Sequence, residues 1–125
     1  MVLIFGGAYQ GKLEFAQDNF DIKDSDIFRC SEDADLDYTK KVFVNFHQFI
    51  LGCVKRGVEA KDVLADNREF LNDKIFIVDD ISQGVVPMDK ELRAWREMVG
   101  RTMLYLSKES DSVYRVFCGI GQQIK

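Results

Sequence analysis

The chain opens with a run of apolar residues, Met1–Phe5, that ends abruptly at Gly6 and Gly7. Successive side chains of a strand point to opposite faces of a sheet, so a strand without polar residues must be covered on both faces. Residues 74–80 repeat this pattern and finish in two acidic residues. Buried strands of this kind are typical of parallel sheets.

Segments with helical spacing alternate with these strands. Apolar residues recur at steps of three and four over residues 42–54, which predicts a helix that ends at Gly57. We also expect helices over residues 12–20, 60–71 and 88–106, strands over residues 26–30 and 112–118, and a polar tail from Gly119. In the helix at 88–106, the inward stripe is Met88, Leu92, Trp95, Val99, Thr102 and Leu106. Such alternation predicts an α/β fold, a parallel sheet covered by helices in a single domain over residues 1–125.

Composition narrows the classes of partner. The 125 residues include 17 Lys and Arg against 21 Asp and Glu, a formal charge of −4, which argues against nucleic acid and anionic membranes as partners. Apolar runs are too short to span a bilayer, and the first residues lack the basic region of a signal peptide. The 3 cysteines include no C-x-x-C pair, so we expect reduced thiols and a cytoplasmic protein.

The turn after the first strand carries the strongest functional motif. It fits the phosphate-binding pattern G-x-x-x-x-G-K and consists of Gly6, Gly7, Ala8, Tyr9, Gln10, Gly11 and Lys12. Glycines let backbone N–H groups surround a phosphate, the start of the following helix adds positive potential, and Lys12 would reach the β- and γ-phosphates of GTP or ATP. Leu13 stands where a Ser or Thr would hold Mg²⁺. The alternative is a glycine-rich turn without a ligand.

Two acidic residues at the end of the second apolar strand, Asp79 and Asp80, are the candidate Mg²⁺ ligands, because this is where P-loop proteins place such a carboxylate. Capping of a loop is the alternative role for them. His47 is the single histidine. If the helix begins at Val42, His47 lies on the flank of its apolar stripe, which predicts a boundary residue without a catalytic role.

Four segments together resemble a known family. They are Gly6–Lys12 against the opening GGARSGKS, Asp79–Pro87 against NEVGxGxVP, Trp95–Arg101 against (F/Y)RD…GR, and Val113–Gly119 against a terminal V-x-x-V-x-x-G. This set is similar to the adenosylcobinamide kinase / adenosylcobinamide-phosphate guanylyltransferase family of cobalamin biosynthesis. The resemblance implies a P-loop α/β domain, often a homotrimer, that phosphorylates a corrinoid with a nucleoside triphosphate. It also implies transfer of GMP through a guanylylated histidine.

The chain differs from that family at the residues that would hold Mg²⁺ and carry the guanylyl group. Leu13 replaces the P-loop Ser, and Asn45 occupies the position of the guanylylated histidine. His47 follows two residues later, about 200° around a helix, and cannot substitute. An alternative alignment sets residues 42–45 against a strand of the family, but the helical spacing disfavours it. We therefore expect a nucleotide- or phosphate-binding protein without guanylyltransferase chemistry, and a cobinamide kinase if any transfer remains. A non-catalytic interaction or regulatory protein is the alternative.

Overall fold

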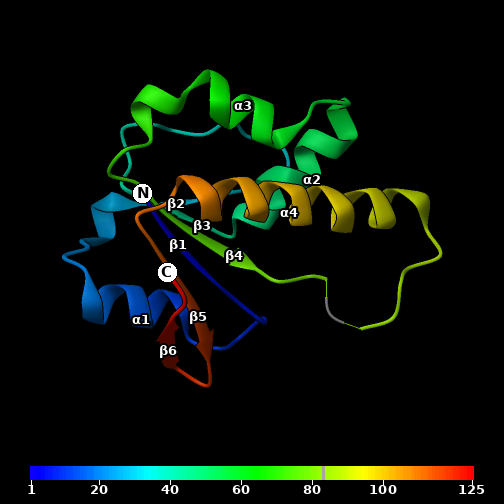
Figure 1. The fold of residues 1–125 in the computed structure, drawn as a ribbon. Helices are drawn as coiled ribbons and strands as arrows, with labels where there is room; N and C mark the ends of the chain where they lie inside the picture. The colour runs from blue at the N-terminus through cyan, green and yellow to red at the C-terminus, as the bar shows by residue number, and fades with distance from the viewer. Residues whose placement is uncertain (83) are drawn as a thin grey trace.

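The structure is a computed structural model that describes residues 1–82 and 84–125. In this part of the chain a six-stranded sheet has the order β2-β3-β4-β1-β5-β6 (Figure 1). The first five strands are parallel, and β6 runs antiparallel to β5. The strands are β1 (Val2–Gly6), β2 (Ile27–Arg29), β3 (Val42–Val44), β4 (Ile75–Asp79), β5 (Ser112–Phe117) and β6 (Ile120–Gln123). The predicted parallel sheet is therefore confirmed, with one antiparallel strand added at its edge.

Helices cover both faces of the sheet. They are α1 (Lys12–Asn19), α2 (Phe46–Arg56), α3 (Ala60–Asp66) and α4 (Lys90–Glu109), and short 3₁₀ turns occupy Asp24–Asp26 and Arg68–Phe70. Figure 1 shows α1 on one side of the strands and the other helices on the opposite side. Each face has its own apolar core: Ala16 of α1 packs with Ile4 and Ile77, whereas Phe46 of α2 packs with Leu3 and Phe76. None of the helices in the described residues is long and apolar enough to cross a membrane.

The prediction of a helix beginning at Val42 was wrong. Val42, Phe43 and Val44 form β3 and are all buried, and α2 begins only at Phe46. A strand covered on both faces contains no polar residues, so its first residue, Val42, matched the spacing of the following helix by coincidence. Asn45 separates the two elements with a left-handed backbone, φ 57°. The strand alternative for residues 42–44 was the better interpretation.

The prediction of a polar tail after Gly119 was also wrong. Ile120–Gln123 forms β6, which pairs with β5 through a two-residue turn at Cys118 and Gly119. Both turn residues have positive φ, 50° and 76°, as a tight hairpin between twisted strands requires. Because β6 lies at the edge of the sheet, most of its side chains are exposed, and its sequence has no apolar pattern that would predict a strand.

The stripe predicted along α4 is buried only in part. Val99, Thr102 and Leu106 are buried, but Leu92 is 41% exposed and Met88 precedes the helix and is 94% exposed. Figure 1 shows the reason: the first turns of α4 extend past the ends of the strands, so there is no sheet beneath them. The helix therefore covers the sheet only with its later turns.

Candidate functional site

The glycine motif connects β1 to α1 at the carboxyl-terminal edge of the sheet, where ligands of parallel α/β proteins bind. Gly6 is the last residue of β1, and Lys12 is the first residue of α1. Between them Tyr9 and Gly11 adopt positive φ, 58° and 82°, and the Tyr9 side chain is fully exposed. The loop has the strand–turn–helix context that its sequence predicted.

Contacts with β5 and its turn fix the shape of this loop. A Cβ at Gly6 would lie 2.3 Å from the carbonyl oxygen of Val116, and one at Gly11 would lie 3.2 Å from the Cα of Gly119. Gln10 holds the turn as well, because its carbonyl accepts from the Gly119 N–H at 2.7 Å and its Oε1 accepts from the Cys118 N–H at 2.7 Å. Packing thus requires a glycine at position 6, and the positive φ together with the close Gly119 Cα favours one at position 11.

Backbone donors remain free along the loop. The N–H groups of residues 7–14 donate to no acceptor within the described residues. The first N–H groups of any helix lack partners inside the helix, and here no side chain caps them either. Such a set of donors at the positive end of a helix favours an anion.

Lys12 lies at the base of the loop and is 7% exposed. Its Nζ donates to the carbonyl oxygen of Gly7 at 2.6 Å and lies 2.7 Å from Oδ1 of Asp79 at the end of β4. The Asp79 side chain is 23% exposed. The structure therefore brings two predicted site residues, Lys12 and Asp79, together as an ion pair.

His47 completes this group, although its sequence position indicated a boundary residue. It is 6% exposed; its Nδ1 accepts from the Asp79 N–H at 3.2 Å, and its Nε2 lies 3.5 Å from Oδ2 of Asp79. Trp95 of α4 donates from Nε1 to the His47 carbonyl at 2.7 Å. The expectation failed because α2 begins at Phe46, so His47 lies in its first turn, directly beside the end of β4.

Burial lowers the pKa of His47 below its ordinary value of 6.5, and the Lys12 cation lowers it further, while Asp79 acts in the opposite direction. A buried imidazole loses hydration on protonation, and this loss dominates. The neutral imidazole is therefore favoured at pH 7. Because Nδ1 accepts a hydrogen bond, the single ring proton lies on Nε2, on the side of Asp79.

This shift predicts a pH dependence of stability. The unfolded chain takes up a proton at His47 near pH 6.5, whereas the folded chain does so only at lower pH. The free energy of unfolding should therefore rise as pH increases to about 6.5 and level off above it. Urea unfolding of the wild type and His47→Gln between pH 5.5 and 7.5 measures this. We expect the variant to lose the slope, and an equal slope in both proteins would contradict the assignment.

A cavity of about 330 Å³ lies beside the loop. Its lining comes from the loop, the first turn of α1 and the ends of β2, β3 and β4: Ala8, Tyr9, Gln10, Gly11, Lys12, Leu13, Glu14, Arg29, Val44, Asn45, Ile77 and Asp79. His47 is not among these residues, since it lies behind Asp79. The Arg29 side chain makes no hydrogen bond or ion pair with any other described residue. Arg29 was not identified from the sequence, although it lies at the carboxyl end of a predicted strand, where ligands of parallel sheets bind.

The structure does not bring the two candidate metal ligands to one site. Asp79 lines the cavity beside Lys12. Asp80 instead lines the cavity under α4 and a smaller one with Gly6, Gly7 and Gln10, and it accepts hydrogen bonds from the backbone N–H and hydroxyl of Ser82. Among the described residues there is no group of three or more His, Cys, Asp or Glu side chains that could hold a metal ion. Leu13 offers no oxygen, so the donors at the loop do not fit a resident Mg²⁺. Gln83 of the Asp79–Pro87 segment lies outside the described residues.

No protein-family model matches this chain, and its sequence matches no curated protein. The resemblance to the cobinamide family therefore stays a hypothesis. The functional inference depends on the geometry of the loop, the ion pair and the cavity.

Proposed function

We propose that this protein binds a phosphate group, carried by a nucleotide such as GTP or ATP, at the loop between β1 and α1. The observation that carries the proposal is the buried Lys12 ammonium at the base of a loop whose backbone donors have no acceptor in the described residues. Backbone N–H groups and a lysine at a helix start are the elements of a P-loop phosphate site. The sheet order is compatible with a P-loop domain, since β4 with its terminal Asp79 lies next to β1.

Binding would exchange partners within the site. An incoming phosphate oxygen would replace Asp79 beside Lys12, because both are anions that compete for the same ammonium group. Arg29 adds a second cation to the cavity wall. The two cations, Lys12 and Arg29, balance the two carboxylates of the lining, Asp79 and Glu14, so the loop N–H groups supply the rest of the attraction for a phosphate.

Guanylyl transfer does not fit the arrangement. Asn45 lines the cavity, and an amide side chain cannot form the covalent intermediate. His47 is buried behind Asp79, with both ring nitrogens directed at that residue. We therefore propose binding without guanylyl transfer, in a degenerate relative of the cobinamide kinase / guanylyltransferase family.

A non-catalytic interaction or regulatory protein is the second candidate. One observation favours it: Lys12 already has two partners, the Gly7 carbonyl and the Asp79 carboxylate, so the loop is neutralised from within. In that case the loop geometry supports the β5–β6 turn and binds no phosphate.

Calorimetric titration with GTP and with ATP, each with and without Mg²⁺, separates these functions. Binding that does not require Mg²⁺ supports phosphate binding without transfer, and a cobinamide co-titration would then test for a corrinoid ligand. Mg²⁺-dependent binding supports a cobinamide kinase with Asp79 as the metal ligand. No binding at millimolar nucleotide supports the interaction protein. Size-exclusion chromatography with light scattering tests the homotrimer.

The absence of a hydroxyl group at position 13, where P-loop proteins have Ser or Thr, leads to a prediction for the same titration. Leu13→Ser places a Mg²⁺ ligand at the position where P-loop proteins have one, so we expect Mg²⁺ to strengthen nucleotide binding by this variant. Leu13→Ala is the matched control, because it removes the same packing from the α1 core without adding an oxygen. If both variants respond equally to Mg²⁺, the hydroxyl is not what the site lacks.

A further inference from the structure

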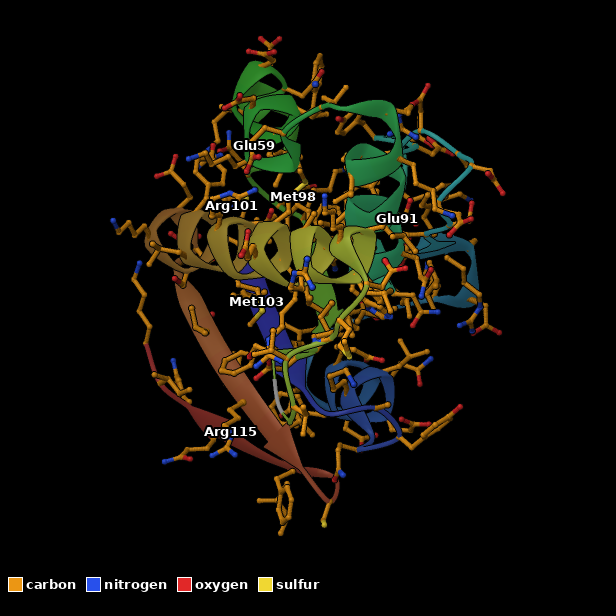
Figure 2. All side chains as sticks on the ribbon, turned by 90° about the vertical axis from the view of Figure 1, so that its right-hand side faces the viewer. Glu59, Glu91, Met98, Arg101, Met103 and Arg115 are labelled. Atoms are coloured by element: carbon orange, nitrogen blue, oxygen red, sulfur yellow. The ribbon has the colours of Figure 1, made fainter. Side chains whose placement is uncertain are left out.

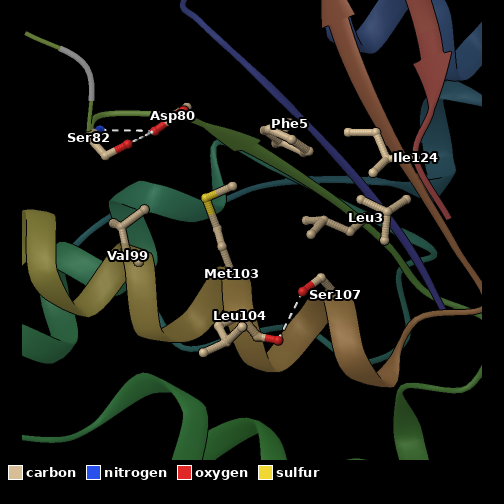
Figure 3. Close-up of a pocket in the computed structure, with 11 residues that line it drawn as sticks. Leu3, Phe5, Asp80, Ser82, Val99, Met103, Leu104, Ser107 and Ile124 are labelled. Atoms are coloured by element: carbon tan, nitrogen blue, oxygen red, sulfur yellow. Dashed lines mark hydrogen bonds between the residues drawn. The ribbon is translucent and has the colours of Figure 1, made fainter.

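A second cavity, of about 390 Å³, lies between α4 and the sheet, on the face opposite α1 (Figure 3). Most of its wall is apolar: Leu3 and Phe5 of β1, Val113 of β5, and Val99, Met103 and Leu104 of α4, with Ile124 near the end of the chain. Figure 2 places Met103 below α4, on the side that faces the strands. This cavity is separate from the one at Lys12, which lies beside the loop.

The polar groups of this cavity are unevenly distributed. Asp80 and Ser82 lie at one end in Figure 3, whereas Leu3 and Ile124 lie at the other. Ser107, on the α4 wall, donates its hydroxyl hydrogen to the Leu104 carbonyl at 3.0 Å. The carboxylate of Asp80 thus places hydrogen-bond acceptors at the first end, where Arg96 donates to the Ser82 carbonyl, and the remaining wall favours hydrocarbon.

The cavity is open to solvent along α4. Leu104 and Ile124 at its rim are each 57% exposed. Gly100 also lines it, and a Cβ at this position would meet no atom within 4 Å. A molecule can therefore enter without displacing backbone, and a side chain at Gly100 would narrow the entrance.

We propose that this cavity binds a small amphipathic molecule with an apolar body and a hydrogen-bond-donating head, a hydroxyl or an ammonium group. The apolar body would lie between α4 and β1, and the head would be directed toward Asp80 and Ser82. The volume falls within the range of small-molecule sites, roughly 300–1,000 Å³. This inference does not depend on phosphate binding at Lys12.

The shape favours a small molecule over a peptide helix. A bound helix needs an open trough along its length, but this cavity has a helix on one side, strands on the other and Ile124 near one end. The charge favours a donor over an anion, since an anionic head would lie next to the Asp80 carboxylate. Arg115 lies in an adjoining cavity of about 200 Å³ that shares Phe5 and Asp80.

Three eight-carbon probes test the proposal: 1-octanol, octylamine and octanoate, with binding measured by ligand-observed NMR and calorimetry. We expect octanol and octylamine to bind and octanoate to bind about tenfold more weakly or not at all. Gly100→Met should weaken binding of octanol about tenfold, because its side chain occupies the cavity. Gly100→Ala is the matched control, since it makes the same change in helix propensity with little filling.

Asp80→Asn provides the head-group test, and it should abolish the preference against octanoate while leaving octanol bound. Three outcomes overturn the proposal. If none of the probes binds, the cavity is only a packing defect, and Gly100→Met should then simply raise the melting temperature. If Gly100→Met leaves binding unchanged, the probes bind elsewhere. If octanoate binds most tightly, Arg115 rather than Asp80 selects the head.

Discussion

Replacing Lys12 by alanine should weaken GTP and ATP binding roughly 10- to 100-fold, the range expected for the loss of one charge-assisted contact. Lys12 is the buried cation at the loop, and its ammonium group lies 2.7 Å from the carboxylate that a phosphate would replace. The loop N–H groups remain in the variant, so we expect residual binding. Calorimetric titration of both proteins at the same ionic strength measures the change.

The Asp79→Asn variant sharpens this test. It removes the anion that competes for Lys12, so phosphate binding without Mg²⁺ should become tighter rather than weaker. If Asp79 instead holds Mg²⁺ in a working kinase, the same variant should weaken Mg²⁺-dependent binding. The sign of the change therefore distinguishes a phosphate-binding site from a metal-assisted one.

Loss of the fold must be separated from loss of binding. Lys12→Ala leaves the Asp79 carboxylate beside the buried His47 without its cation, which destabilises the protein. The double variant Lys12→Ala, Asp79→Asn removes both charges and serves as the control. Equal affinity for nucleotide in Asp79→Asn and in this double variant would contradict phosphate binding at Lys12.

Much of the fold was predictable because its signals are local. The apolar runs that became β1 and β4 are covered on both faces, so their composition alone indicated buried parallel strands. The strand–turn–helix context of the glycine motif was predicted correctly, since a turn between strand and helix needs specific residues at fixed spacing. Predicted bounds of α1 and β5 differ from the observed ones by a residue at most.

The errors arose where one signal fits two structures. Val42 and Phe46 are four residues apart, as in one helix, yet they belong to a strand and a helix separated by the left-handed Asn45. That error in turn misplaced His47, because the direction of a helical side chain depends on where its helix begins. Its burial beside Asp79 is a tertiary contact between α2 and β4, and no local pattern reports it.

Arg29 and the β6 strand were missed for a different reason. Each lies at the margin of the sheet, where side chains are exposed and composition resembles that of a loop. Which strand ends meet at the cavity depends on the strand order β2-β3-β4-β1-β5-β6, and periodicity alone does not determine that order. The pairing of Lys12 with Asp79 requires β1 and β4 to be neighbours, and no sequence pattern predicted that order.

Replacing Gly6 by alanine should lower the free energy of unfolding by roughly 3 kcal/mol or more, because the new methyl group has no space. The added Cβ would lie 2.3 Å from the carbonyl oxygen of Val116 and 3.3 Å from its carbonyl carbon. Both are backbone atoms of β5, so relief requires β1 and β5 to separate where the loop begins. Urea unfolding measures the loss, and the melting temperature should fall by about 10 °C.

Gly7→Ala is the matched control, one residue further along the same loop. Its Cβ would meet only the Cγ of Gln10 at 3.6 Å, an ordinary contact with a flexible side chain. We therefore expect little change in stability from Gly7→Ala, whereas a bound phosphate that approaches the Gly7 backbone closely would be hindered. Equal destabilisation by the two variants would contradict the packing role of Gly6. Weakened nucleotide binding in a stable Gly7→Ala protein would separate the glycine needed for the fold from the glycine needed for the ligand.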